Sequence, residues 1–223
     1  MVALNQSIKI RKYIKSDREA VRKISCDTAF LGEPVENFFE GADIIADFLT
    51  AYYTDYEPQS CFIAEFGSKT AGYLIGTTDE NKMLKTLLFK ILPKSFFKAF
   101  FKGVFFKKKN ILFSWWNIYS FLKGQFFPKI SLKNYPALLH INFSAEYRGK
   151  GLGSILLKEY LDYLNNEKIP GVHLTTHSEK AGRFFEKNGF KLLLKTKRSY
   201  YRGVLHKDIG YFYFGMLLNQ IPL

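Results

Sequence analysis

The order of apolar and polar residues along the chain predicts alternating strands and helices. Runs of strand length, either alternating or continuously apolar, occur in seven places. They are residues 7–14, 60–66, 71–79, 137–143, 171–177, 191–201 and 208–218. The second and third runs surround a glycine-containing turn, which is typical of a hairpin, and the last two predict a closing antiparallel pair.

Helical periodicity fills the segments between these strands. It predicts helices over residues 15–30, 37–56, 153–168 and 180–190. Ser16, with Glu19 three residues later, has the pattern of a capping box at the first helix. Asn188 and Gly189 form a typical C-terminal cap for the last. The order of elements predicts a mixed α/β fold, in a single domain spanning residues 1–223.

One segment interrupts this order between the third and fourth strands. Residues 81–134 hold 12 lysines and no Asp, Glu or Arg, whereas the rest of the chain has 21 basic and 20 acidic residues. The net charge of +13 therefore belongs to the insertion. Lys94, Lys98 and Lys102 recur every fourth residue, which predicts a basic amphipathic helix, and a second helix is expected through Trp115 to Phe121.

The insertion also holds 11 phenylalanines and both tryptophans. We expect these aromatic side chains to be packed, either as a lid over a binding site on the core or in a homodimer contact, because large exposed apolar patches are rare. A basic surface resting on an anionic membrane is the second hypothesis. Nucleic-acid binding is disfavoured, because the segment lacks arginine, the usual base-reading residue.

Cysteine content and the chain's start predict a reduced, cytoplasmic protein. Cys26 and Cys61 lie far apart, and neither a disulfide framework nor a CxxC motif is indicated. The first residues lack the apolar core of a signal peptide, and no uncharged apolar run reaches the length of a spanning helix.

The stretch "EYRGKGLGSILLKEYL", residues 146–161, carries the main chemical signal. Gly149, Gly151 and Gly153 stand between a predicted strand and a predicted helix. Glycines let the backbone approach a ligand closely, and a helix N-terminus offers unpaired N–H groups and partial positive charge, so the loop favours anions such as phosphate. Neither the Walker A pattern nor the dinucleotide fingerprint fits its spacing.

The spacing Arg-x-x-Gly-x-Gly of Arg148, Gly151 and Gly153 resembles the GNAT superfamily of N-acetyltransferases, and "AGRFFEKNGF" is similar to the family's later helix. The stretches "CFIAEFGSKTAGYLIGTTD", "YPALLHINF" and "PGVHL" more closely resemble bacterial acetyltransferases akin to the acetyltransferase-like C-terminal domain of O-GlcNAcase. The resemblance covers Ser7 to Leu218 except the insertion. It implies the GNAT fold, a mixed central sheet flanked by helices.

This resemblance also implies a site for acetyl-CoA. In the family the fourth and fifth strands are parallel and splay apart, and the acetyl-pantetheine arm lies between them. Backbone groups of Ile141 and Phe143 would hold that arm. The residues that would hold the pyrophosphate follow the fourth strand: Arg148, Gly149, Lys150, Gly151, Leu152, Gly153 and Ser154.

Polar side chains on the same two strands are candidates for the chemistry. His140 and Asn142 share one face of the fourth strand, and His173 and His177 share one face of the fifth. Histidine titrates near neutral pH, so His140 or His177 could relay a proton from an ammonium substrate, with Asn142 as a substrate ligand. The alternative is that these residues are structural. No carboxylate accompanies the histidines, so we predict no metal site.

Two positions depart from the family pattern. Asn142 stands where close relatives often have aspartate. Phe185 stands where the family has a tyrosine that protonates the leaving thiolate. Here that proton would come from Tyr200, Tyr201 or Tyr211, or the thiolate would leave without it. The resemblance implies acetyl transfer to a primary amine. We predict direct attack and not a ping-pong route, because neither cysteine lies on the site strands. The alternatives are a non-catalytic module that binds CoA or a partner, and a peripheral membrane protein acting through the insertion.

Acidic residues before and within the second predicted helix could face a cationic acceptor. They are Glu33, Glu36, Glu40 and Asp43. A solvated helix face is the simpler interpretation for most of them.

Overall fold

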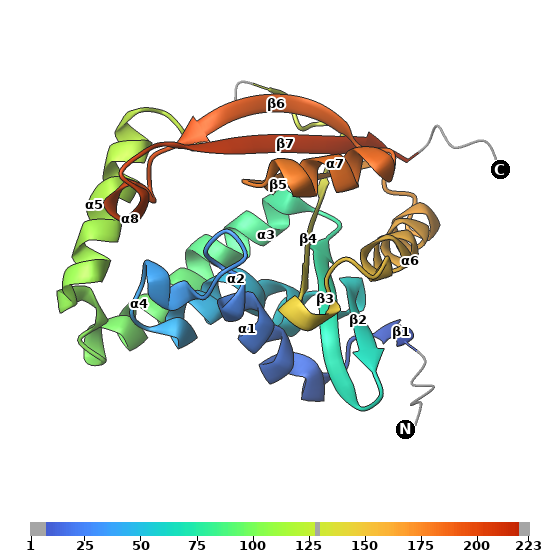
Figure 1. The fold of residues 1–223 in the computed structure, drawn as a ribbon, viewed down its shortest axis with the longest axis horizontal. Helices are drawn as coiled ribbons and strands as arrows, with labels where there is room; N and C mark the ends of the chain where they lie inside the picture. The colour runs from blue at the N-terminus through green and yellow to red at the C-terminus, as the bar shows by residue number, and fades with distance from the viewer. Residues whose placement is uncertain (1–7, 128–129, 219–223) are drawn as a thin grey trace.

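The computed structural model describes residues 8–127 and 130–218, which form a seven-stranded sheet with helices packed on both faces (Figure 1). The strands are β1 (Ile8–Lys12), β2 (Cys61–Phe66), β3 (Lys69–Thr77), β4 (Ala137–Phe143), β5 (Gly171–Thr176), β6 (Lys191–Arg198) and β7 (Ile209–Leu217). The helices are α1 (Arg18–Asp27), α2 (Ala42–Tyr56), α3 (Glu80–Thr86), α4 (Leu92–Phe101), α5 (Lys108–Leu122), α6 (Leu152–Asn166), α7 (Glu179–Lys187) and α8 (Arg202–Leu205).

The strands lie in the order β1-β2-β3-β4-β5-β7-β6. Every neighbouring pair is antiparallel except β4 and β5, which are parallel. The predicted hairpin, the predicted closing pair and the strand at residues 137–143 are all confirmed. In Figure 1 the strands β5, β6 and β7 run across the top, β1 to β3 lie at the lower right, and β4 stands between the two groups.

Alternate residues of β4 face two different cores, as the two-residue period of a strand requires. Leu139 belongs to a buried cluster with Leu157 of α6 and Phe185 of α7. Leu138, one residue earlier, belongs to a cluster with Val21 of α1 and Tyr52 of α2. The sheet therefore has a face covered by α6 and α7 and a face covered by α1 and α2.

The predicted capping box at Ser16 is wrong. The chain enters α1 through a 3-10 turn, and the helix begins at Arg18 with Asp17 at the N-cap position. The Asp17 carboxylate accepts the Ile14 backbone N–H at 2.9 Å and binds the Arg11 guanidinium at 2.7 Å. An acidic residue suits this position because its two carboxylate oxygens bind the Arg11 guanidinium, which joins β1 to the start of α1.

The second helix begins later than predicted. The helical pattern extends from residue 37, but α2 starts at Ala42, because Gly41 before it has a φ of 120°. That backbone conformation ends helical geometry and strongly favours glycine. A Cβ at Gly41 would lie 3.1 Å from a methyl group of Val104, so the turn also lets the insertion approach closely.

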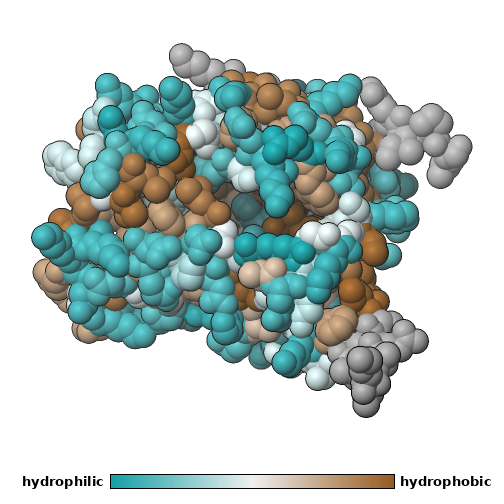
Figure 2. Space-filling view, in the orientation of Figure 1, coloured by the Kyte–Doolittle hydropathy of each residue, from teal (hydrophilic) through white to brown (hydrophobic). Residues whose placement is uncertain are grey.

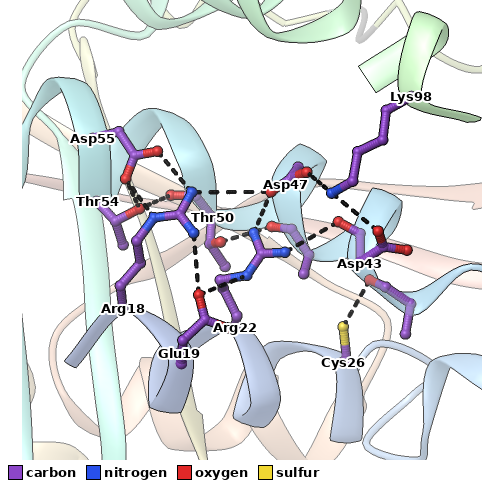
Figure 3. A network of polar contacts seen from close by, with 12 residues as sticks. Arg18, Glu19, Arg22, Cys26, Asp43, Asp47, Thr50, Thr54, Asp55 and Lys98 are labelled. Carbon is purple, nitrogen blue, oxygen red and sulfur yellow. Dashed lines mark hydrogen bonds and ion pairs between the residues drawn. The ribbon is translucent and has the colours of Figure 1, made fainter. Parts of the chain in front are cut away.

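The insertion forms α3, a π-helical turn at Leu87–Ile91, α4 and α5, and the two predicted helices are confirmed. Ion pairs attach α4 to α2 (Figure 3). The Lys98 ammonium contacts Asp47 at 2.7 Å and Asp43 at 3.0 Å, and Lys102 contacts Asp43 at 2.6 Å. Asp43 is thus paired with the protein's own lysines, which argues against its being free for a cationic acceptor.

Asn110 fixes the start of α5. Its side-chain carbonyl accepts the Glu40 backbone N–H and its amide donates to the Glu40 carbonyl, both at 2.7 Å. At its middle, α5 packs against α8, where a Cβ added to Gly203 would lie 2.8 Å from Leu112. The insertion therefore spans from α2 to the connection between β6 and β7.

The expectation that the insertion's aromatic side chains pack on the core is wrong for most of them. Phe113 does pack, with Phe38 and Tyr201. The exposed aromatic residues are Phe89, Phe96, Phe97, Phe100, Phe101, Phe105, Phe106, Trp115, Phe121, Phe126 and Phe127. The physical reason on α4 is that its inward face is formed by the small Ser95 and Ala99.

Glu57 organises the junction between α2 and the hairpin. Its carboxylate is 2% exposed and accepts hydrogen bonds from Tyr52 (2.8 Å), Ser60 (2.9 Å), Thr77 (2.7 Å) and the Thr78 backbone (2.8 Å). Burial acts to raise the Glu57 pKa, but the hydrogen bonds from Thr77 and Thr78 outweigh it and leave the pKa lowered. The ionised form is therefore stabilised in the folded protein.

We expect Glu57→Gln to lower the free energy of unfolding by about 2 kcal/mol at neutral pH, because an amide N–H₂ group must then face buried donors. Since the pKa of Glu57 lies below its unfolded value of 4.5, this difference should be full above that pH and shrink as pH falls through the lowered pKa. Urea denaturation over a pH series measures it.

The exposed Glu159 of α6 provides the matched control. Glu159→Gln should change the free energy of unfolding by less than about 0.5 kcal/mol. An equally small effect of Glu57→Gln at neutral pH would contradict the assigned role.

Candidate active site

The parallel strands β4 and β5 part soon after they begin. They pair only at Ala137 with Val172 and at Leu138 with His173. Beyond these positions β4 continues along β3 as far as Phe143, and β5 continues along β7. The sheet thus splits between β4 and β5, and Figure 2 shows a hollow near the centre of the molecular face, close to β4. A split of this kind leaves backbone donors and acceptors on β4 open to a ligand.

The backbone groups that face the split belong to alternate residues of β4. The Ser144 N–H, just after the strand, donates to the Ala71 carbonyl of β3 at 3.0 Å. Since backbone groups alternate between the two edges of a strand, Ile141 and Phe143 direct theirs toward β5. The Phe143 carbonyl accepts a hydrogen bond from Arg148 at 3.0 Å, which agrees with that direction.

The glycine loop lies at the open end of this split, between β4 and α6. Gly149 and Gly151 have φ angles of 76° and 77°, in the left-handed region that favours glycine. A Cβ at either would have no atom within 4 Å, so backbone conformation and not crowding requires glycine there. Gly151 caps α6, and the N–H groups of Leu152 and Gly153 follow it at the helix N-terminus.

Gly153 differs from the other two glycines. It lies within the first turn of α6, and a Cβ there would come 3.0 Å from the ring of Phe184 on α7. Its absent side chain lets the two helices approach closely. The Ser154 N–H is also engaged, since it donates to the Gly151 carbonyl at 3.2 Å.

Arg148 links the glycine loop to the connection between α1 and α2. Its Nε donates to the Phe143 carbonyl at 3.0 Å, and its Nη2 donates to the Gly32 carbonyl at 3.2 Å. Gly32 and the preceding Leu31 both have positive φ angles, 97° and 58°. The guanidinium therefore supports the loop through two backbone carbonyls and has N–H groups left over for an anion.

His140 and Asn142 lie together on the face of β4 that α1 and α2 cover. The His140 ring meets Tyr53 of α2 edge-on, with centroids 5.7 Å apart. Burial, aided by His173, lowers the pKa of His140 to about 4. The Asn142 amide donates to the Tyr73 hydroxyl at 2.9 Å. His140 is therefore neutral at physiological pH and a weak proton acceptor.

His177, which follows β5, has a different environment. Its Nδ1 lies 2.8 Å from the Gly210 carbonyl and its Nε2 lies 2.6 Å from the Tyr200 hydroxyl. Because a carbonyl only accepts, Nδ1 carries the proton, and the neutral ring's Nε2 accepts from Tyr200. Burial lowers the pKa of His177 and raises that of Tyr200. Sequence reasoning placed His177 here but had no signal for its bond to Tyr200.

The tyrosines considered as acids separate in the structure. Tyr201 donates to the Ala29 carbonyl at 3.1 Å, and Tyr211 donates to the Thr175 hydroxyl at 2.8 Å. Only Tyr200, of these three, contacts a ring nitrogen of His177. Phe126, near the end of the insertion, stacks on Tyr200 with ring centroids 6.1 Å apart. The insertion therefore packs against the Tyr200 ring.

The three strand histidines do not converge on one point. His173 is 1% exposed; its Nδ1 lies 2.8 Å from the Tyr135 carbonyl and its Nε2 lies 3.5 Å from Glu80. Its partners are thus separate from those of His140 and His177. Within residues 8–127 and 130–218, no three His, Cys, Asp or Glu side chains are arranged to hold a metal ion.

Both cysteine thiols are buried, and burial favours their protonated form. Burial raises the pKa of Cys26 to about 11 and raises that of Cys61 further. A thiol held in its protonated form is a poor nucleophile. This agrees with a reaction in which the acceptor attacks the acyl donor directly.

A model of the acetyltransferase (GNAT) family matches residues 19–190, which include the split strands, the glycine loop and α7. The chain belongs to the GNAT acetyltransferase family. It is accordingly an acetyl-CoA-dependent acyltransferase, and the mixed sheet flanked by helices is the fold of this family. A comparison with curated protein sequences finds no match.

Solved structures agree in fold. SsHAT aligns with a TM-score of 0.68 and 21% identity over 95% of this chain and 98% of that one. A polyamine N-acetyltransferase of Drosophila melanogaster aligns with a TM-score of 0.59 and 13% identity, over 95% of this chain and 100% of that one. The putative acetyltransferase yncA of Salmonella typhimurium, solved with acetyl-CoA, aligns with a TM-score of 0.56 and 13% identity over 97% of both chains.

We expect the His140 imidazole to titrate with a midpoint near pH 4 in a proton NMR titration, because its burial disfavours the charged ring. As its pKa lies below the unfolded value of 6.5, the folded protein should lose stability as pH falls from 6.5 toward 4. A His140→Asn variant assigns the resonance, and a midpoint above 6 would contradict the assigned burial.

Proposed function

We propose that this GNAT acyltransferase moves an acetyl group from acetyl-CoA to a primary amine by direct attack, in the split between β4 and β5. One observation carries the proposal: the parallel strands part after Leu138, and the left-handed Gly149 and Gly151 lie at the open end of the split. A thioester arm and a pyrophosphate need these two environments side by side.

The acyl donor would be held mainly by backbone. Ile141 and Phe143 have donors and acceptors along the split, as an amide-containing pantetheine arm requires. The N–H groups of Leu152 and Gly153 lie at the helix N-terminus next to Gly151, where a Cβ would meet no atom, and a helix N-terminus favours phosphate. The remaining predicted cofactor residues, Arg148, Lys150 and Ser154, would support this loop by charge and packing.

The acceptor amine would approach from the face covered by α1 and α2. Asn142 is on that face, and its side-chain carbonyl can accept from an amine while its amide remains on Tyr73. In the reaction the amine nitrogen bonds to the thioester carbon, the carbon–sulfur bond breaks, and CoA leaves as a thiolate. The amine then has a proton to lose, which the thiolate can finally accept.

We assign the first transfer of that proton to Tyr200 and His177. The Tyr200 oxygen can accept the amine's proton while its own proton passes to Nε2 of His177, 2.6 Å away. The Gly210 carbonyl, bound to Nδ1, stabilises the resulting imidazolium. This assignment favours His177 over His140, because the Nε2 of His177 has the Tyr200 hydroxyl as its partner.

A module that binds CoA without turnover is the second candidate. The buried Phe185 favours it, because it lies in the core with Phe190 and Phe214 and has no proton to donate. A thiolate is a good leaving group, so we prefer the enzyme. Within the family we retain the closer relation to bacterial proteins akin to the O-GlcNAcase C-terminal domain, and a cytoplasmic location, as predictions.

Calorimetric titration of acetyl-CoA into the wild type and a Gly151→Glu variant tests the loop. We expect the variant to bind about 100-fold more weakly, because a carboxylate would occupy the pyrophosphate's place. The matched control is Gly103→Glu, since Gly103 also has a positive φ and open space around it but lies in the insertion. No binding by the folded wild type would overturn the proposed site.

A Tyr200→Phe variant tests the proton route. In a CoA-release assay with a panel of amines, we expect kcat to fall about 100-fold while the KM for acetyl-CoA stays within about twofold. Tyr211→Phe is the matched control. It also removes a tyrosine hydroxyl near His177, but that hydroxyl donates to Thr175 and not to His177. Equal losses in both variants would contradict the relay, and no CoA release with any amine would favour the binding module.

A further inference from the structure

The outward face of α4 is made of phenylalanine. Phe96, Phe97, Phe100 and Phe101 are between 52% and 83% exposed, and the spacing of these four residues places them on one side of the helix. Monomeric soluble proteins rarely expose contiguous apolar surface of this kind unless it binds something. A solvated helix would carry polar residues there.

The orientation of α4 is fixed by its opposite face. Ser95 and Ala99 are buried there. Lys98 reaches across to the carboxylates of Asp43 and Asp47 on α2 (Figure 3), and Lys102 also binds Asp43. A rotation of α4 that turned the phenylalanines inward would break those ion pairs. The two lysines would then face solvent, and the carboxylates of α2 would lose their lysine partners. The aromatic face is therefore directed outward by the rest of the structure.

The apolar surface continues beyond α4. Phe105 and Phe106 follow in the next turn, and the Phe105 ring lies 5.0 Å from that of Phe96. On α5 an exposed stripe recurs at helical spacing: Ile111, Trp115, Ile118 and Leu122. Figure 1 places α5 along the left edge of the molecule, where Figure 2 shows brown side chains beside teal ones.

The charge of this surface has one sign. Residues 81–134 contain 12 lysines and no acidic residue. Lys98 and Lys102 pair with α2, whereas Lys85, Lys90 and Lys94 are exposed and form no ion pair within the described part of the chain. Ammonium groups without an ion-pair partner in the described residues thus lie close in sequence to the exposed phenylalanines.

We propose that α4, the turn after it and the exposed stripe of α5 form a membrane-binding surface that rests on an anionic lipid bilayer. Lysines at the rim bind anionic headgroups while phenyl rings enter the boundary between headgroups and acyl chains. No helix in the described residues is long and apolar enough to cross a bilayer, so the contact is peripheral. The proposal is independent of the proposed acetyl transfer.

Charge favours lipid over the other occupants. A second copy of the chain meeting the first through the same surface would bring two sets of lysines together, and residues 81–134 hold no carboxylate to pair with them. Nucleic acid would match the lysines, but four adjacent phenyl rings on one rigid helix suit an acyl interface better than bases that must each be separately stacked.

The test is cosedimentation of the full chain with vesicles of phosphatidylcholine alone and of phosphatidylcholine with about one third phosphatidylserine. We expect binding to the anionic vesicles that weakens with salt, and at least about tenfold weaker binding to neutral ones. A Phe97→Ser, Phe101→Ser double variant should lose at least about tenfold in binding to anionic vesicles.

Matched controls separate each effect from folding. Phe48→Ser removes an exposed phenylalanine from α2 and should leave vesicle binding unchanged. Lys94→Glu should weaken binding about tenfold, whereas Lys187→Glu, exposed on α7, should not. Acetyl-CoA binding measured in parallel should be the same in all four variants, so a failure of the site and a failure of the surface are distinguishable.

Three results would overturn the proposal. The first is equal vesicle binding by the wild type and the double phenylalanine variant. The second is no vesicle binding together with a dimer that the same double variant dissociates, which would assign the surface to a second copy. The third is binding to a single-stranded RNA oligonucleotide but not to vesicles.

Discussion

The early parting of β4 from β5 is the constraint on which the rest of the site depends. Parallel strands normally satisfy each other's backbone groups along their whole length, and here they do so at only two positions. Each strand keeps its other neighbour, so the sheet stays intact while an edge opens in its middle. The proposed acetyl-CoA site is therefore built mostly from backbone groups, which explains how glycines and apolar residues could form a polar site.

The insertion is held to this framework by polar and aromatic contacts. Lys98 and Lys102 pair with α2, Asn110 pairs with the Glu40 backbone, and Phe126 covers the Tyr200 ring. Lys98 and Lys102 of the insertion are thus paired with acids of α2, whereas Lys85, Lys90 and Lys94 remain exposed in the segment that carries the aromatic surface. In our proposals the same segment covers the candidate site beside β5 and presents a different face to a lipid surface.

Much of the fold could be predicted from the sequence, because local signals suffice for it. The period of two in "ALLHINF" determined β4 and which side chains share a face, and Asn188 and Gly189 marked the end of α7. The spacing of Arg148, Gly151 and Gly153 was enough to suggest the family that the comparison identifies. The start of α1 was mistaken because Asp17 is held by Arg11, a contact that depends on β1 and β2 and not on the helix itself.

The sequence by itself therefore determined the order of elements, the family and the glycine loop, since each depends on residues that are neighbours along the chain. Only the tertiary structure decided that Gly153 serves helix packing, that the His140 ring packs edge-on against Tyr53, and that His177 contacts Tyr200. It also decided that the phenylalanines of α4 face outward, because the partners of Lys98 lie about 50 residues away on α2. Burial and charge pairing between distant segments set these outcomes, and no local pattern encodes them.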